Sequence, residues 1–471
     1  MFEGKSKLLF LPFNFGEIIN LNSMSKVYKV TKGLDIKLKG VADKVYESAT
    51  PETYAIKPTD FHGIFPKLLH REGDEVKAGT PILYDKYNEH ARFASPVSGE
   101  IVEVKRGAKR KMLEVKILAD KELKYEKGNP KDGSREEVIE TMSNAGLWPF
   151  LKQRPYDVIA DPEQTPKSIH ISAFDTAPLG ADLDFCLHGR EKDFQRGLDV
   201  LSKLTKGKVH LNVHRTKTTS EVFRNAKGVQ VNEFDGPHPS GLVGVQINKV
   251  DPINKGDIVW TIDAQRVAVI GRYFNEGIYD ASIVVSLGGS RVEKPRYYKT
   301  LIGASIKDMV KNNLSESPEN LRFISGNPLV GDAIEKDGYI GYYHNSVCVL
   351  PEGDSPQFLG WLAPNFDKFS MSRTFFSWLQ GVKQYDLNTN TNGEERALVV
   401  TGQYDKVMPM DILPQQLIKS IIVEDVEQME LLGIYEVIPE DFALCEYVCT
   451  SKQNLQNIVR KGLDIAKEEL G

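Results

Sequence analysis

The chain has 471 residues, 41% of them hydrophobic and 27% charged, which is typical of a globular protein of three or four domains. A net charge of −5, with no basic run that stands out, excludes the basic surface of a nucleic-acid-binding protein. Four cysteines are too few for a disulfide scaffold and indicate a reducing compartment.

The N-terminus contains a short apolar stretch, LLFLPF, after two lysines. It is too short for a signal peptide, Pro12 interrupts it, and no small-residue cleavage site follows. We therefore interpret residues 1–23 as an upstream extension and Met24 as the true start. No apolar run approaches the roughly 20 residues of a membrane span. The expected location is the cytoplasm, with any membrane contact made through a partner.

Residues 24–127 alternate short β-like stretches with glycine-containing turns, which predicts a small all-β domain. Around Lys86, the phrases REGDEVKAG and SPVSGEIVEV resemble lipoyl and biotinyl carrier domains, whose modified lysine stands at a hairpin tip. The predicted arms, 81–85 and 91–95, place that tip near Asn88, two residues beyond Lys86. We therefore expect a barrel-sandwich hybrid with an unmodified turn lysine, and a carrier function as the alternative.

Residues 128–255 alternate helical and strand patterns: a helix over 134–151, a strand over 167–174, a helix over 191–207 and a strand over 208–214. This order predicts βαβ units and a Rossmann-like domain with a parallel sheet.

Residues 256–370 return to strands, beginning with DIVWTID, and suggest a β-grasp (SLBB-like) domain with one embedded helix. Residues 371–471 are predicted to form a C-terminal helical domain. Pro414 suits a first helical turn, and the last helix has its apolar residues on one face. These residues are Leu455, Ile458, Val459, Leu463 and Ala466. The whole chain is thus expected to be a multidomain α/β protein.

Two C-terminal phrases, VMPMDILPQQLI and DFALCEYVCTSKQNLQNIV, resemble the iron–sulfur segment of the C subunit of Rnf electron-transport complexes. Two C-x2-C-x2-C-x3-C-P runs hold [4Fe–4S] clusters there. With Cys449 as the last ligand, six of the eight ligand positions are not cysteine: Pro439, Phe442, Leu398, Thr401, Tyr404 and Met408. We expect the cluster chemistry to be lost. Cys445 and Cys449 remain open as ligands of a shared metal or as buried thiols.

The candidate nucleotide-binding loops also lack the residues that would bind a cofactor. Flavin-binding relatives, including the NADH-binding subunit of complex I, grip FMN and NADH with a glycine-rich loop and an acidic loop. Residues 144–157 contain a single glycine here, and residues 173–185 contain no Glu-Gly-Glu-Pro. A phosphate cradle needs glycines so that backbone N–H groups can approach. A Rossmann-like domain without a nucleotide is the expectation.

Together these features resemble the A subunit of the sodium-translocating NADH:quinone reductase from about residue 26 to residue 470. The phrases that carry the resemblance, in order, are GLWPFLKQRPYD, FDGPHPSGLVGVQINKVDP, VSLGGSRVEKPRYYKTLIGAS, RFISGNPLVG, FSMSRTFFSWL, MPMDILP and FALCEYVC.

The resemblance implies a peripheral protein, on the cytoplasmic face, of a six-subunit membrane complex that oxidises NADH, reduces quinone and exports sodium. It implies docking on the membrane-embedded B subunit and an association with ubiquinone or menaquinone. FAD, FMN and the iron–sulfur clusters belong to partner subunits, so no tightly bound cofactor is expected in this chain.

A quinone contact needs an apolar slot with an aromatic wall and a polar donor. Trp148, Phe150, Arg154 and Tyr156 offer both, and His238 in the turn PHPSG is a candidate for the same cavity. Each also has an ordinary interpretation, as a core aromatic, a surface arginine or a structural histidine. No catalytic residue and no metal site is predicted. The alternatives are an Rnf-type flavin and iron–sulfur protein and a cofactor-free assembly scaffold.

Overall fold

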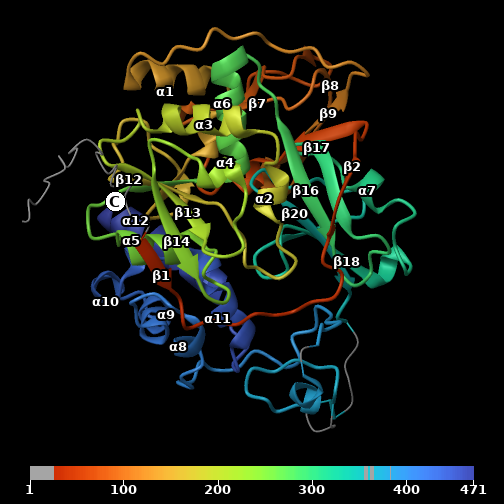
Figure 1. The fold of residues 1–471 in the computed structure, drawn as a ribbon, viewed down its shortest axis with the longest axis vertical. Coiled ribbons are helices and arrows are strands. Elements are labelled where there is room, and N and C mark those ends of the chain that lie inside the picture. Colours follow the sequence, from red (N-terminus) through yellow and green to blue (C-terminus); the bar gives the residue numbers. More distant parts are fainter. Residues whose placement is uncertain (1–25, 355–358, 361–364, 382) are drawn as a thin grey trace, which may run out of the picture.

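The computed structural model describes residues 26–354, 359–360, 365–381 and 383–471. The predicted extension, residues 1–23, and Met24 lie outside this part of the chain. The described residues form four β-sheets and a C-terminal group of helices (Figure 1). The multidomain α/β class predicted from the sequence is confirmed.

The barrel-sandwich hybrid consists of two small antiparallel sheets. Alternate residues of the longest strands point inward, so that Ile101, Val115 and Ile117 are fully buried. The strands of one sheet are, in order, β3 (Thr53–Ile56), β9 (Met112–Ala119), β8 (Gly99–Arg106) and β5 (Glu75–Val76). The strands of the other are β4 (Pro66–Leu68), β6 (Pro81–Asp85) and β7 (Asn88–Ala94).

Lys86 lies at a hairpin tip, and the expectation that the tip is near Asn88 was wrong. Asp85 of β6 pairs with Asn88 of β7, so Lys86 and Tyr87 are the two residues of the turn. The second arm begins three residues earlier than predicted, because the polar residues from Asn88 onward extend β7. The Lys86 ammonium is exposed and lies 5.1 Å from the centroid of the Tyr87 ring.

The α/β domain contains a seven-stranded sheet whose central strands are parallel, as the βαβ pattern predicted. Helix α5 packs against β12, and α3 packs against α6. The strand order is β1 (Lys26–Lys29), β14 (Gln230–Asp235), β13 (Lys208–His214), β12 (Ser168–Ser172), β15 (Val259–Asp263), β10 (Lys152–Arg154) and β11 (Val158–Ile159). The helices are α1 (Arg135–Asn144), α2 (Leu183–Cys186), α3 (Glu191–Leu201), α4 (Glu221–Arg224), α5 (Val243–Val250) and α6 (Ala264–Glu276).

Two sequence expectations about this domain need correction. Strand β15, expected in the following domain, lies between β12 and β10 and continues the seven-stranded sheet beyond residue 255. The helix expected over 134–151 ends at Asn144. Gly146 follows with a φ of +68°, a left-handed conformation that stops a helix. Pro149 then stands in a short 3₁₀ turn, Trp148–Phe150.

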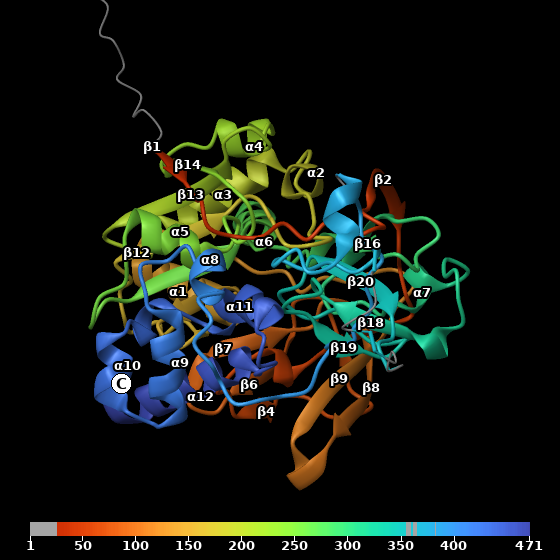
Figure 2. The same ribbon diagram turned by 90° about the horizontal axis from the view of Figure 1, so that it is seen from below.

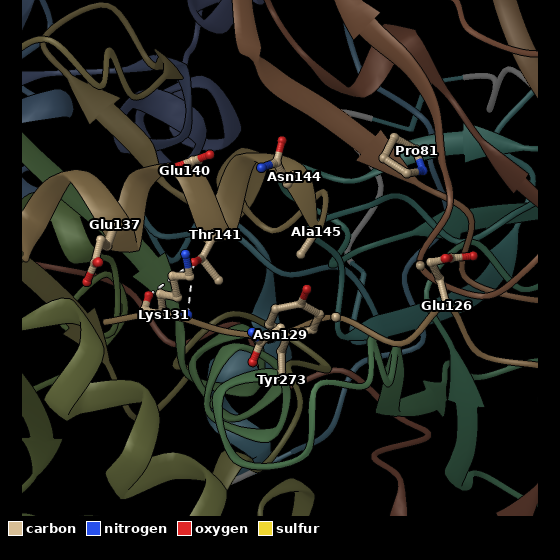
Figure 3. A pocket seen from close by; sticks show the side chains of 12 residues that line it. Pro81, Glu126, Asn129, Lys131, Glu137, Glu140, Thr141, Asn144, Ala145 and Tyr273 are labelled. Carbon is tan, nitrogen blue, oxygen red and sulfur yellow. Dashed lines mark hydrogen bonds between the residues drawn. The ribbon is translucent and has the colours of Figure 1, made fainter. Parts of the chain in front are cut away.

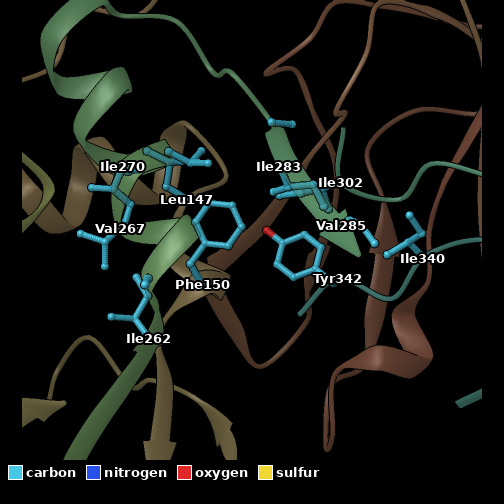
Figure 4. Packing of buried hydrophobic residues seen from close by; sticks show 14 of the residues in the cluster. Leu147, Phe150, Ile262, Val267, Ile270, Ile283, Val285, Ile302, Ile340 and Tyr342 are labelled. Carbon is cyan, nitrogen blue, oxygen red and sulfur yellow. The ribbon is translucent and has the colours of Figure 1, made fainter. Parts of the chain in front are cut away.

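The SLBB-like domain is a six-stranded mixed sheet with one short helix, α7 (Lys307–Val310). A buried apolar cluster joins it to the α/β domain, with Phe150 facing Tyr342 (Figure 4). Because β2 comes from the N-terminal segment, that segment contributes to this sheet as well. The strand order is β19 (Asp332–Ile334), β18 (Leu321–Ser325), β20 (Ser346–Pro351), β16 (Ser282–Gly288), β17 (Arg296–Leu301) and β2 (Asp43–Ser48).

The C-terminal helices pack against the α/β domain through their apolar faces (Figure 2). Pro414 begins α9, as predicted. Four of the five apolar residues predicted on the last helix are fully buried, and Ile458 is partly buried. The helices are α8 (Tyr404–Val407), α9 (Pro414–Ile422), α10 (Val426–Leu431), α11 (Ala443–Val448) and α12 (Leu455–Leu470). Among the described residues, none of the helices has the length and apolar character needed to cross a membrane.

Candidate functional site

The structure places two of the predicted quinone-contacting residues, Trp148 and Phe150, in the hydrophobic core. The indole N–H of Trp148 donates to the Ala160 carbonyl at 2.8 Å, and its ring meets Trp260 edge-on. Phe150 stacks on Tyr342 with 5.3 Å between ring centroids. Both side chains are at most 1% exposed. Trp148 packs within the α/β domain, and Phe150 joins that domain to the SLBB-like domain.

Arg154 and Tyr156 face the C-terminal helical domain instead. The Arg154 guanidinium is buried and contacts the carboxylates of Asp441 at 2.8 Å and Glu440 at 3.2 Å. It also donates to the Glu436 carbonyl at 3.4 Å. The Tyr156 ring meets the Tyr435 ring edge-on, with 6.4 Å between centroids. These two residues therefore form the α/β side of an interdomain contact.

His238 lies elsewhere, at the carboxyl end of β14. Its backbone N–H donates to Asp35 Oδ1 at 2.9 Å, and its Nδ1 lies 3.1 Å from the Thr176 hydroxyl. Burial lowers the pKa of the imidazole to about 4, and nearby Asp35 opposes part of that shift. The ring is therefore neutral at pH 7. Through its ring and its backbone N–H, His238 joins its own loop to the loops that carry Thr176 and Asp35.

A cavity of about 310 Å³ opens between the α/β domain and the helical domain, next to Tyr435. Its lining combines apolar side chains with a few charged ones. Leu413 and Leu431 are 53% and 77% exposed, so the mouth of the cavity is accessible and apolar. The lining residues are Ile253, Asn254, Lys255, Asp411, Ile412, Leu413, Glu430, Leu431, Leu432, Gly433, Tyr435 and Glu436. Hereafter we call it the tyrosine cavity.

Hydrogen bonds hold the polar groups of the tyrosine cavity in place. Asn248 donates to Glu436 Oε2 at 2.7 Å and accepts from the Asp411 N–H at 3.3 Å. The Lys255 ammonium lies 2.6 Å from Glu430 Oε1. Burial raises the pKa of Glu436, only partly offset by the Asn248 bond, so this carboxyl keeps its proton to a higher pH than an ordinary glutamate.

Of the five predicted residues, only Arg154 and Tyr156 lie beside this cavity. Arg154 bonds the backbone of Glu436, and Tyr156 packs on Tyr435, so each supports a lining residue. Trp148, Phe150 and His238 do not line it. Sequence reasoning missed Tyr435 and Glu436, because the phrase LLGIYEVIPE contains no recognisable motif and its partners come from a distant part of the chain.

A second cavity of about 290 Å³ lies between the barrel-sandwich hybrid, α1 and α6 (Figure 3). Most of the side chains that line it are polar, and the charged ones are Glu126, Glu137, Glu140 and Lys131. Tyr273 of α6 supplies the aromatic surface. Each cavity is lined by three carboxylates and one lysine, but only the tyrosine cavity also has leucine and isoleucine side chains in its wall, so it is the better match to an apolar ring.

The four cysteines are all buried and free. Cys449 Sγ lies 2.9 Å from the Tyr404 hydroxyl, and burial raises the pKa of the Cys445 thiol. Thiolates are the form that binds metals, so the burial of Cys445 disfavours this thiol as a cluster ligand. Within the described part of the chain, no three His, Cys, Asp or Glu side chains are arranged to hold a metal ion.

Family models match three consecutive segments of the chain, one for each of the three domains that contain β-sheets. Residues 28–120 match the NqrA N-terminal barrel-sandwich hybrid domain, residues 133–279 the NqrA second alpha/beta domain, and residues 284–336 the NQRA C-terminal domain of SLBB type. The second match ends after α6, in agreement with the place of β15 and α6 in the α/β domain. The fold thus defines a multidomain protein of the NqrA class.

Full-length relatives extend this match. The chain is 37% identical to the A subunit of the Na(+)-translocating NADH-quinone reductase of Marinomonas sp. (strain MWYL1), over 94% of this chain and 100% of that protein. It is 36% identical to the corresponding protein of Neisseria meningitidis serogroup B, over 94% and 99%. The chain belongs to the NqrA family, the A subunits of the Na⁺-translocating NADH-quinone reductases.

A solved structure shows a weaker likeness. The air-oxidized NAD⁺-reducing [NiFe]-hydrogenase is 12% identical, covers 73% of this chain and 68% of its own, and gives a TM-score of 0.35. A score this low carries no argument about function.

Proposed function

We propose that this chain is the peripheral A subunit of a sodium-translocating NADH:quinone reductase and that it contacts the quinone. In this proposal it docks on the membrane-embedded B subunit at the cytoplasmic face of the membrane, within a six-subunit complex. NADH oxidation, FAD, FMN and the iron–sulfur clusters belong to the partner subunits. Family membership over 94% of the chain supports the assignment to the complex.

The observation that carries the quinone contact is the tyrosine cavity. A quinone head group is a flat ring with two carbonyl acceptors and an apolar tail. The leucines at the mouth suit the tail, and the Tyr435 ring offers an aromatic wall. Lys255 is a donor that can reach a carbonyl oxygen, once it leaves Glu430. Of the predicted residues, Arg154 and Tyr156 take part by positioning Glu436 and Tyr435.

The raised pKa of Glu436 fits the chemistry of a quinone. Reduction to the quinol takes up two electrons and two protons. The electrons come from partner subunits in this proposal. A carboxyl that keeps its proton to a higher pH than an ordinary glutamate can hold a proton beside the ring. Asn248 fixes the direction in which this carboxyl points.

The carboxyl edge of the Rossmann-like sheet supports a chain without a tightly bound flavin. Phosphate groups bind at this edge, near backbone N–H groups and cations. Here Asp175 follows β12, and its carboxylate covers Gly180, whose missing Cβ would lie 2.4 Å from it. Part of Asp175 reaches solvent, but its carboxyl lies among protein groups, and burial raises its pKa to about 6. Ionised Asp175 and neighbouring Asp263 would repel a phosphate.

The test is equilibrium binding of a short-chain ubiquinone analogue to the purified full chain by titration calorimetry. Leu413→Trp narrows the mouth of the tyrosine cavity and is expected to weaken binding at least tenfold. Leu379→Trp is the matched control, because Leu379 is similarly exposed, at 60%, and does not line the cavity. It should bind like the unchanged chain.

Two results would contradict parts of the proposal. Equal affinity of the two variants for the quinone analogue would show that the quinone does not bind in this cavity. Absence of binding by the unchanged chain would favour the assembly-scaffold alternative, and flavin or iron–sulfur absorbance in the purified chain would favour the Rnf-type alternative.

A further inference from the structure

The hairpin of β8 and β9 projects from the body of the molecule and ends in a compact tip (Figure 2). The backbone of the tip closes on itself, because the Gly107 N–H donates to the Lys111 carbonyl at 2.8 Å. Lys109 and Arg110 have φ angles of 51° and 60°, a conformation that residues other than glycine adopt infrequently. The tip therefore adopts a defined turn conformation, held by a backbone hydrogen bond.

This tip carries a concentrated positive charge. Residues 105–111, KRGAKRK, contain five cations and no carboxylate, and we call them the basic finger. All five cationic side chains belong to exposed residues. The expectation that no basic run stands out was wrong, because the net charge of −5 averages this segment with the acidic remainder.

The nearest carboxylates do not neutralise the finger. Glu103 lies 2.7 Å from Lys116, midway along the hairpin. Glu114 is shared between Lys116 at 3.7 Å and Lys105 at 3.8 Å. Among the described residues, Lys109, Arg110 and Lys111 have no carboxylate within ion-pair distance. Three adjacent unpaired cations repel each other, so an anionic partner would stabilise this arrangement.

We propose that the basic finger binds the anionic phospholipid head groups of the membrane that holds the other subunits. This inference rests on the proposed function, which places the chain beside a membrane. Each clustered lysine or arginine strengthens binding to an anionic bilayer roughly fivefold. The acidic body would be repelled from the same surface, so a projecting hairpin is the part that can reach it. No aromatic residue stands in the finger, as stacking on nucleic-acid bases would require.

The test is co-sedimentation of the full chain with vesicles of about one third phosphatidylglycerol in phosphatidylcholine, and with vesicles of phosphatidylcholine alone. We expect binding to the anionic vesicles only, and its loss when salt rises from ~0.1 M to ~0.5 M. The variant K109Q/R110Q/K111Q should bind roughly a hundredfold more weakly. K307Q/K311Q/K336Q removes the same charge from exposed lysines elsewhere and should bind normally.

Binding of both triple variants alike, or no anionic-lipid binding by the unchanged chain, would overturn the proposal. So would a finger-dependent association with the purified partner subunits in lipid-free detergent, which would indicate an acidic protein partner. A charge-keeping variant, K109R/R110K/K111R, should bind vesicles normally. Assembly with the partner subunits tests the proposed function separately, because the finger variant should still assemble in detergent if only the lipid contact is lost.

Discussion

Arg154 Nη1 donates to Asp441 Oδ2 at 2.8 Å, although the two residues stand 287 positions apart in the chain. Their side chains are 2% and 0% exposed. Asp441 Oδ2 also accepts from the Ile438 N–H at 2.9 Å, so one carboxylate oxygen links the α/β domain to the turn before α11. Because the same guanidinium bonds the Glu436 carbonyl, this pair sets the position of one wall of the tyrosine cavity.

Removing one partner of this pair should be strongly destabilising. Arg154→Ala leaves the Asp441 carboxylate buried without its cation, so we expect a loss of about 3–5 kcal/mol in the free energy of unfolding. Urea denaturation measures it. Lys461→Ala breaks an exposed pair with Glu424, whose side chains are 59% and 55% exposed, and should cost less than ~1 kcal/mol. Similar losses in the two variants would contradict the structural role of Arg154.

Gly146 should tolerate no side chain. Its φ is +68°, and a Cβ would lie 2.5 Å from the Ala94 Cβ, on strand β7 of the first domain. Gly228 has a similar φ of +73° with nothing within 4 Å, so Gly228→Ala carries the backbone strain alone, about 1 kcal/mol. Gly146→Ala should cost about 1–3 kcal/mol more, because packed atoms must move. Equal shifts in the melting temperatures of the two variants would show that the contact yields freely.

His238 should make the protein lose stability as pH falls. Its pKa is about 4 in the folded chain and ordinarily about 6.5, so below pH 6.5 the unfolded chain takes up a proton that the folded chain does not. The contribution is complete above pH 6.5 and decreases by roughly 3 kcal/mol as pH falls to 4.

This pH dependence can be assigned by substitution. His238→Gln should flatten the plot of unfolding free energy against pH between 6.5 and 4. His188→Gln, at an exposed position, is the control and should leave the slope unchanged. An unchanged slope in His238→Gln would mean that the imidazole is protonated in the folded protein.

The cysteines should be unreactive until the chain unfolds. Burial raises the pKa of the thiols of Cys186, Cys348 and Cys445, and all four thiols are enclosed. A thiol-specific chromogenic reagent at pH 8 should label the native protein slowly and four sites in denaturant. Rapid native labelling of Cys445 or Cys449, or iron that is lost on labelling, would instead indicate an accessible metal-binding pair.

The tip position of Lys86 makes its modification state worth measuring. The chain is expected to have the mass of its sequence, since Lys86 is flanked by Asp85 and Tyr87 and not by the methionines of carrier domains. Intact-mass spectrometry of the chain from its native source decides this. A lipoyl or biotinyl mass increase mapped to Lys86, and lost in Lys86→Arg, would establish the carrier alternative.

The sequence predicted those parts of the molecule that depend on local pattern. The parallel sheet followed from alternating strands and helices between residues 167 and 214, and the buried face of α12 from residues spaced by one helical turn. The prediction failed where distant segments decide the outcome. Strand β15 was assigned to the wrong sheet, because its neighbours β12 and β10 are about 90 to 110 residues away.

The residues of the candidate site were likewise predictable from the sequence only in part. Order and spacing of its phrases determined the family from the sequence alone, and residue types marked Arg154 and Tyr156. Only the tertiary structure decided that Trp148 and Phe150 are core residues, that Tyr435 and Glu436 line a cavity, and that five cations stand on a projecting tip. Composition and spacing record which groups a chain carries. Burial and pairing arise only when sheets and helices pack, and these decide which groups a ligand can reach.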